Sequence, residues 1–256
     1  MSYPRVSYRS YRVWQRNRDV FFRLWKAELA PYLIEPIFIL AAMGFGLGAY
    51  IGLIGGQTYL QFIVPGIVAS YAMFTATFEC TYGSYVRMEH QKTYDAIIAT
   101  PVNIEDVIGG EIFWAATRSL LTACIILLVA FAFVHTLSPF AVLIPIVTVL
   151  EGLMFGSLAM VFTSITPSIT AYNYYFTLFL TPMFFFSGVF FPLVSMPVVV
   201  QRLAWFLPLT PVVTLDRALI SGELTPGLLA ELGFILGLIV VLFTTSLITM
   251  RRRLIK

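Results

Sequence analysis

Charged side chains are scarce in this sequence. Asp, Glu, Lys and Arg make up 11% of its 256 residues, whereas a soluble domain typically carries about 25%. Apolar residues make up 59%, and the mean hydropathy is +0.88. One chain of this length cannot bury so much apolar surface in a core of its own. The composition therefore excludes a water-soluble protein and predicts that lipid surrounds most of the chain.

Motifs for phosphate binding and catalysis are also missing. None of the three lysines, Lys26, Lys92 and Lys256, follows a glycine, so no G-x-x-x-x-G-K-[ST] loop exists. The sequence has no G-x-S-x-G, no H-E-x-x-H and no paired Cys/His cluster, and its two cysteines form no C-x-x-C motif. We therefore expect a chain that is not an enzyme and binds no cofactor or metal of its own.

Long apolar runs are abundant. A transmembrane helix needs roughly 20 mostly apolar residues, and continuous runs rich in Leu, Ile, Val and Phe favour helices over the short alternating segments of a β-barrel. We predict an all-α integral membrane protein with six transmembrane helices, at about residues 33–54, 59–82, 108–134, 140–163, 171–191 and 228–248.

The basic residues predict the orientation of these spans. Of the 16 Lys and Arg residues, 13 lie before the first span, between spans two and three, or after span six. Only Arg202 and Arg217 fall between spans five and six, and Arg118 lies inside span three. Because cytoplasmic segments carry the excess of Lys and Arg, both termini are predicted to be cytoplasmic (N-in, C-in).

The first 30 residues form a unit distinct from the transmembrane domain at residues 31–256. Most of its basic residues share one helix face with Asp19, and aromatic residues gather on the opposite face, which Arg18 interrupts, at Tyr11, Trp14, Phe21, Phe22 and Trp25. This pattern is typical of an amphipathic helix lying along the cytoplasmic membrane surface. Both a simple anchor and a working element fit it.

Glycines recur every four residues in the first span, at Gly44, Gly48, Gly52 and Gly56. Small residues at this spacing share one helix face and let two helices approach closely in lipid. We expect this face to pack against a second copy of the chain or against span five, with ordinary internal packing as the alternative.

Three charged residues are predicted to lie within the bilayer or at its inner edge. Arg118 and Glu79 fall at similar depth, so an ion pair between them, or an Arg118 side chain reaching the interface, would stabilise both. Glu151 lies near the middle of span four. An intramembrane carboxylate is a functional candidate by default, with a protonated structural group as the alternative.

Residues 188–211 are apolar but contain four prolines and Gly188, which exclude one long helix. Apolar backbone that does not complete a span predicts short re-entrant or interfacial helices at the outer surface.

A charged island, Arg87–Glu111, holds seven of the chain's 29 charged residues between two apolar runs. Tyr94, Ile97 and Ile98 form one apolar stripe on a short helix that Pro101 ends. Asn103 is then the predicted N-cap of the next helix, whose first turn carries Glu105 and Asp106. A short rigid helix between two spans could move them as a unit, which predicts a mechanical link to a soluble motor, with a solvated helix that has no partner as the alternative.

Three stretches, "QFIVPGIVA", "RMEHQKTYDAIIATPVNIEDVIGGEIFWAATRS" and "LTPMFFFSGVFFPLVSMPVVVQRLAWFLPLTPVV", resemble the ABC-2 type export permeases, in particular the nodulation protein J group of lipo-oligosaccharide exporters. The resemblance covers about Arg16 to Arg251. It implies a bacterial inner-membrane exporter made of two permease copies, here as a homodimer, and two ATP-binding subunits that hold the ATP and Mg. No nucleic-acid partner is expected.

The resemblance also implies roles for particular segments. The helix at about 87–100 would be the coupling helix seated on the ATPase, with contacts from Arg87, Glu89, Lys92, Tyr94, Asp95, Ile97, Ile98, Thr100 and Pro101. The re-entrant segment would cap the exit path through Gly188, Phe190, Phe191, Pro192 and Pro197.

The expected function is the permease subunit of an ATP-driven exporter of an amphipathic or lipid-linked cargo. The aromatic run after span four is the candidate lining of the cargo path, at Tyr174, Tyr175, Phe176, Phe184 and Phe185, although aromatic residues facing lipid would give the same pattern. The alternative is an ion- or proton-coupled carrier that works alone through Glu151, Glu79 and Arg118.

Overall fold

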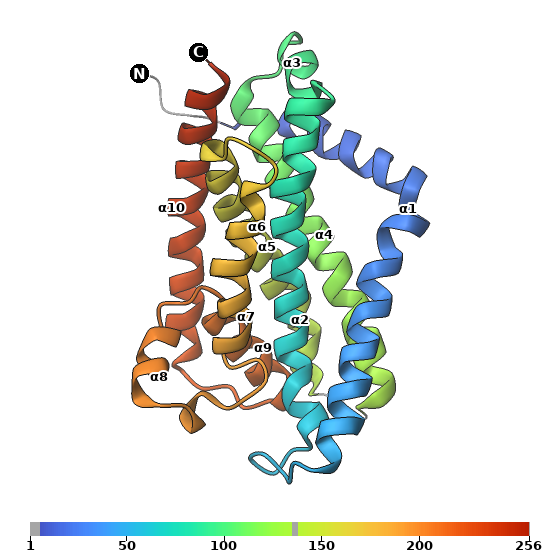
Figure 1. The fold of residues 1–256 in the computed structure, drawn as a ribbon, viewed down its shortest axis with the longest axis vertical. Helices are drawn as coiled ribbons and strands as arrows, with labels where there is room; N and C mark the ends of the chain where they lie inside the picture. Colours follow the sequence, from blue (N-terminus) through green and yellow to red (C-terminus); the bar gives the residue numbers. More distant parts are fainter. Residues whose placement is uncertain (1–5, 135–137, 256) are drawn as a thin grey trace.

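The computed structural model describes residues 6–134 and 138–255, without the side chains of residues 27 and 29–33. Within these ranges every regular element is helical, and the one β-bridge, Ile54 to Gln57, is isolated (Figure 1). The prediction of an all-α protein is therefore confirmed. The first five residues of the predicted 1–30 unit lie outside the described residues.

Five long helices form the body of the molecule. The first is α1 (Ser10–Ala41), which has 32 residues and continues through a π-helical turn (Ala42–Gly46) and a 3-10 turn (Leu47–Ala49). Next comes α2 (Tyr59–Phe78), which continues through two π-helical segments, Glu79–Gly83 and Val86–His90. The others are α4 (Ile104–Phe133), α5 (Ile144–Ile165, preceded by a 3-10 turn, Pro139–Leu143) and α10 (Leu228–Leu254).

Shorter helices connect them. The six-residue helix α3 (Thr93–Ile98) joins α2 to α4. A helical run after α5 consists of α6 (Ala171–Tyr175), a π-helical segment (Phe176–Leu180) and α7 (Thr181–Phe186). A 3-10 turn (Leu193–Ser195) then leads to α8 (Val198–Ala204) and α9 (Leu209–Ser221).

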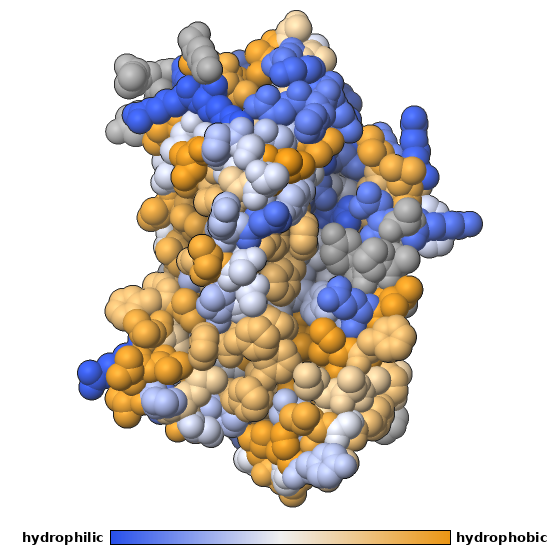
Figure 2. All heavy atoms as spheres, in the orientation of Figure 1, coloured by the Kyte–Doolittle hydropathy of each residue, from blue (hydrophilic) through white to orange (hydrophobic). Residues whose placement is uncertain are grey.

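The basic segments gather at one end of the bundle. The start of α1, the helix α3 and the end of α10 lie together, whereas α8, α9 and the loop between α1 and α2 lie at the opposite end (Figure 1). Hydrophilic atoms crowd the first end, and apolar atoms dominate the surface toward the second (Figure 2). This is the grouping that the count of Lys and Arg led us to expect.

The described residues contain four helices long and apolar enough to cross a membrane, or five if the bent pair α8–α9 is one span. They include the runs predicted as spans two, three, four and six. The run predicted as span one is a shorter apolar helix, Ile34–Ala49, because the chain turns after Ala49. The run predicted as span five ends at Phe186, before Gly188 with φ +80. The total of six spans stays a prediction.

The structure corrects two local predictions. The helix of span two runs on to His90, and Lys92 has φ 53, so Arg87 and Glu89 end one helix and α3 is a separate one. The predicted single helix at 87–100 is therefore wrong. Gly52 and Gly56 lie beyond the helix end at Ala49, so they do not share a helix face with Gly44 and Gly48.

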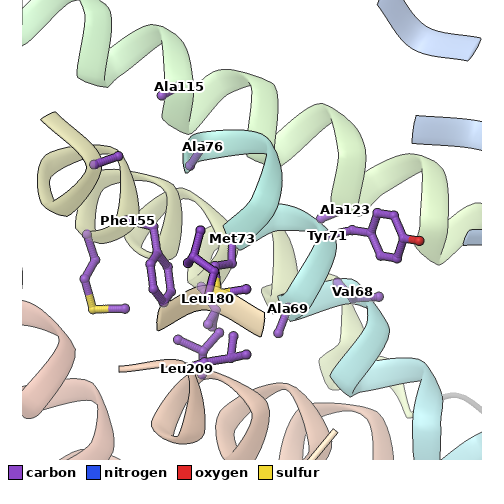
Figure 3. Close-up of a cluster of buried hydrophobic side chains, with 14 of the residues drawn as sticks. Val68, Ala69, Tyr71, Met73, Ala76, Ala115, Ala123, Phe155, Leu180 and Leu209 are labelled. Atoms are coloured by element: carbon purple, nitrogen blue, oxygen red, sulfur yellow. The ribbon is translucent and has the colours of Figure 1, made fainter. Parts of the chain in front are cut away.

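The core centres on α2, whose side chains are buried along most of their length by α4, α5 and α9. Figure 3 shows Met73 of α2 among Phe155 of α5, Leu180 of the π-helical segment before α7, and Leu209 of α9. Small residues bring the long helices together: a Cβ added to Gly152 of α5 would lie 2.6 Å from Ala116 Cα of α4. Close backbone approach of this kind is a main source of helix association in lipid.

Candidate functional site

A cluster of charged side chains joins three helices near the end of the bundle that carries α3. Arg87 Nη1 lies 2.8 Å from Glu79 Oε1, and Arg87 Nη2 contacts Glu111 Oε2. Arg118 Nη1 lies 2.8 Å from Glu28 Oε2 and 3.6 Å from Glu79 Oε2. We call these five residues the charge cluster. Its members come from α1, the π-extended end of α2, and α4.

Glu111 is the most deeply buried member of the charge cluster, with no exposed surface. Besides Arg87, its carboxylate accepts a hydrogen bond from Asn17 Nδ2 at 3.0 Å and one from Ser84 Oγ at 3.2 Å. Isolated charges are costly to bury, and paired, hydrogen-bonded ones are tolerated. One carboxylate thus ties α1, α2 and α4 together.

The local backbone explains how α2 presents its two charges. Glu79 and Arg87 lie in separate π-helical segments, whose wider turns occur often at functional sites. Gly83 lies between them, and a Cβ there would be 3.2 Å from Glu79 Oε1 and 3.3 Å from Arg87 Nη2. The missing side chain therefore leaves room for the ion pair.

The sequence located part of this cluster. Glu79 and Arg118 do form an ion pair, one of the two arrangements considered for them. Glu28 and Asn17 were missed, because the pattern of α1 gives them no special position. Glu111 enters the sequence analysis only as the end of the charged island, and its burial against α1 has no sequence signal.

The stripe of α3 faces the chain's own bundle. Tyr94 is fully buried, and Ile97 and Ile98 are half-buried against the core. Burial, and then the nearby Glu111 carboxylate, raise the pKa of the Tyr94 hydroxyl, which therefore stays neutral. The exposed side of α3 and the turn after it carries Lys92, Asp95, Ala96, Ala99, Thr100 and Pro101.

Ion pairs fasten both sides of α3 to α10. Arg253 Nη2 lies 3.0 Å from Glu89 Oε1, just before α3, and Arg251 Nη1 lies 2.8 Å from Glu105 Oε1, just after it. Arg253 Nη1 also donates to the Thr166 carbonyl at 2.8 Å, at the end of α5. Asn103 is the N-cap of α4, as its sequence predicted.

The start of α1 is fastened to the same region. Ser7 Oγ donates to Asp106 Oδ2 at 2.9 Å, and Arg9 Nη1 contacts the Pro101 carbonyl. A Cβ added to Gly110 of α4 would lie 2.5 Å from Val13 Cβ and 2.7 Å from the Ser10 carbonyl oxygen, so the backbones of α1 and α4 approach closely here. The segments around α3 therefore contact α1, α4, α5 and α10.

A cleft of about 420 Å³ opens beside the charge cluster, between α1, α2 and α4. Three arginines line it, Arg16, Arg87 and Arg118, together with two carboxylates, Glu28 and Glu79. Its remaining walls are mostly apolar or aromatic, and include Val20, Phe21, Leu24, Phe78, Tyr82 and Trp114. Figure 2 shows hydrophilic atoms set into this face of the molecule.

An aromatic stripe follows α2 and the α6–α7 run. The ring centroid of Phe176 lies 5.6 Å from that of Tyr82 and 4.4 Å from that of Phe78. The ring centroids of Phe74 and Phe184 are 5.5 Å apart. Of the predicted path residues, Phe176 and Phe184 belong to this stripe, Tyr175 is buried, and Tyr174 and Phe185 are exposed.

The stripe ends at the segment between α7 and α8. Phe184 lies 4.9 Å from Phe190, which is buried, whereas Phe191 is exposed. Arg217 of α9 donates to the Gly188 carbonyl at 2.8 Å and lies over the Phe62 ring. Pro192 precedes the 3-10 turn and Pro197 is the N-cap of α8.

Glu151 lies apart from the charge cluster. It is fully buried in α5 near Asp216 of α9, which is also fully buried. The four carboxylate oxygens of this pair have no hydrogen-bond partner in the described part of the chain. No group of three or more His, Cys, Asp or Glu among the described residues could hold a metal ion.

Comparison with known proteins adds an independent line of evidence. Residues 10–220 match the family described as ABC-2 type transporter. Nodulation protein J of Rhizobium leguminosarum bv. trifolii is 38% identical over 246 residues, 95% of this chain and 93% of that protein. Nodulation protein J of Bradyrhizobium diazoefficiens is 36% identical over 254 residues, 99% and 97% of the two chains. The inner membrane transport permease YadH of Escherichia coli is 26% identical over 200 residues, 77% of each.

Proposed function

This chain belongs to the ABC-2 type transporter family and is an ABC transporter permease, and from that premise we propose that it forms the membrane path of an ATP-driven exporter. ATP and Mg bind to a separate ATP-binding protein, since this sequence has no phosphate-binding loop. Two permease copies and two ATP-binding subunits make up the complete transporter in the bacterial inner membrane.

The observation that carries this proposal is the set of contacts around α3. A short helix at the basic end of the bundle is tied to α10 on both sides, by Glu89–Arg253 and Glu105–Arg251. The charge cluster beside it joins α1, α2 and α4. A push on α3 by a motor that closes on ATP therefore reaches several transmembrane helices at once.

The exposed face of α3 is the part available to that motor. Tyr94 is buried and Ile97 and Ile98 are half-buried, so they transmit the push into the bundle, while Asp95, Ala96 and Ala99 face outward. Arg87 and Glu89 lie just before α3 and form ion pairs with Glu79 and Arg253, so they connect α3 to the bundle. We assign motor contact to the exposed residues and force transmission to the others.

The predicted membrane topology assigns a place to the shorter helices as well. Six spans with both termini inside include α6–α7 and the second half of α1 as shorter membrane elements, and α8 with α9 form the outer re-entrant pair. The first half of α1 lies along the inner membrane surface, with Tyr11, Phe22 and Trp25 exposed toward lipid.

The cargo we propose is an amphiphile such as a lipo-oligosaccharide or other glycolipid. Its support is the amphipathic lining of the protein: a charged cleft near α3 shares Phe78 and Tyr82 with an aromatic stripe that reaches Phe190. Aromatic faces suit both acyl chains and sugar rings, whereas the arginines suit a polar head.

The decisive experiment is co-purification with the ATP-binding protein, followed by cargo-stimulated ATP hydrolysis in proteoliposomes. Ala96→Arg and Ala99→Arg place charge on the exposed face of α3 and are expected to abolish binding while leaving the permease folded. Ala230→Arg, exposed on α10 at the opposite end, is the matched control. Export that continues without any ATP-binding protein would refute the proposal.

A second candidate function rests on the buried Glu151–Asp216 pair. Two unpartnered carboxyl groups in the membrane region are a feature of proton-coupled carriers. This carrier predicts transport that follows a proton gradient without ATP and stops when Glu151 is replaced by an apolar residue.

A further inference from the structure

Three arginines line the 420 Å³ cleft between α1, α2 and α4 together with Glu28 and Glu79, and Glu111 lies beneath the lining. Each of the three carboxylates has a direct arginine partner: Glu79 pairs with Arg87 and Arg118, Glu28 with Arg118, and Glu111 with Arg87. The group is therefore balanced in charge, but its ion pairs involve only two of the three lining arginines.

Arg16 is the lining arginine that forms no direct ion pair with a described residue. Its guanidinium is half-buried and contacts only neutral oxygens: Nη1 donates to Asn17 Oδ1 at 2.9 Å and Nη2 to Thr93 Oγ1 at 3.4 Å. Among the described residues, no carboxylate lies within ion-pair distance of Arg16. The neighbouring Arg87 has a buried Nε that has no hydrogen-bond partner among these residues. Guanidinium groups with free donor capacity match the oxygens of phosphate and sulfate.

The apolar rim of the cleft indicates that its ligand also has an apolar part. Val20 and Leu24 of α1 and Phe78 of α2 line the cleft and are 46%, 55% and 42% exposed. The volume lies within the range of about 300–1,000 Å³ typical of small-molecule sites. It holds a headgroup, and acyl chains can continue over the rim along the aromatic stripe.

We propose that this cleft binds an anionic amphiphile, with its phosphate or sulfate at Arg16 and Arg87 and its chains across Val20, Leu24 and Phe78. The cleft is lined by residues of the permease alone, so lipid binding can be measured without the ATP-binding partner, and its failure would leave the proposed ATP-driven mechanism standing.

The test uses the purified full-length permease and phosphatidylglycerol, with bound lipid counted by native mass spectrometry over a concentration series. Arg16→Gln is expected to weaken phosphatidylglycerol binding by about tenfold, the effect of losing one charge-assisted hydrogen bond. Arg12→Gln removes the same charge from an exposed position on the same helix, where the Arg12 guanidinium donates to Gln15 Oε1, and is expected to change binding by less than about twofold.

Each comparison has an outcome that overturns the proposal. Equal losses for Arg16→Gln and Arg12→Gln would show general attraction to basic residues, and equal binding of phosphatidylcholine would show an apolar surface without headgroup recognition. Inorganic phosphate that displaces the lipid at comparable concentration would show an anion site without a role for the chains. Failure of phosphate to do so supports the amphiphile.

A second variant keeps the test valid if Arg16→Gln does not fold. Val20→Glu adds a carboxylate at the exposed rim without removing any contact of the charge cluster. It is expected to weaken phosphatidylglycerol binding at least as much as Arg16→Gln and to weaken phosphatidylcholine binding less. Unchanged phosphatidylglycerol binding would overturn the proposal.

Discussion

Arg253 Nη2 lies 3.0 Å from Glu89 Oε1, an ion pair that joins the last turn of α10 to the last turn of the extended α2. The two residues are 164 positions apart in the chain. Through Glu89, the end of the last helix is attached directly ahead of α3. This attachment gives Arg253 a structural contact in addition to the predicted part that the C-terminal basic residues play in membrane orientation.

Arg253→Gln is expected to weaken coupling more than stability. The substitution removes the ion pair with Glu89 and the hydrogen bond to the Thr166 carbonyl, so it should lower the free energy of unfolding by about 1–2 kcal/mol. Cargo-stimulated ATP hydrolysis should fall severalfold because one of the two ion pairs between the α3 region and α10 is lost. Arg252→Gln is the control, since Arg252 is exposed. Equal stimulated activity in the two variants would contradict the transmission role.

Glu111→Ala is expected to be strongly destabilising. It removes the fully buried acceptor for Asn17, Ser84 and Arg87, and breaking a buried ion pair typically costs about 3–5 kcal/mol. Thermal unfolding in detergent measures the change. The exposed Glu223→Ala is the control, and a similar melting temperature for both variants would show that the charge cluster adds little.

Gly110→Ala is expected to push α1 away from α4. The new Cβ would meet Val13 Cβ at 2.5 Å and the Ser10 carbonyl at 2.7 Å, and overpacking of this kind typically costs about 1–3 kcal/mol. Limited proteolysis near Ser10 should accelerate as α1 detaches. Gly237→Ala, where nothing lies within 4 Å, should be neutral or slightly stabilising. Identical proteolysis of both variants would argue against tight docking of α1.

Glu151→Met separates the two candidate functions. An apolar side chain of similar length removes a buried carboxyl group that has no partner, so we expect a gain of about 1–3 kcal/mol in stability and normal ATP-driven export. Melting temperature and export are measured on the same preparation. Loss of export in a well-folded variant would favour the proton-coupled carrier. The matched Asp216→Leu is expected to behave in the same way.

Much of the architecture follows from local pattern. The apolar runs place α2, α4, α5 and α10, and Asn103 marks the start of α4, because helix caps and hydrophobic length act within a few residues. Gly188 and the prolines after it likewise mark where α7 ends and α8 begins. The absence of a phosphate-binding loop is read directly from the sequence.

Tertiary contacts decided the remaining features. The sequence alone determined an all-helical chain with a charged island and basic ends, because composition and periodicity act along the chain. The structure decided that Tyr94 faces inward, that Gly52 and Gly56 leave the helix, and that Glu111 lies between Asn17 and Arg87. These outcomes depend on which helix lies opposite, and charges brought together from distant positions leave no spacing that a linear pattern could reveal.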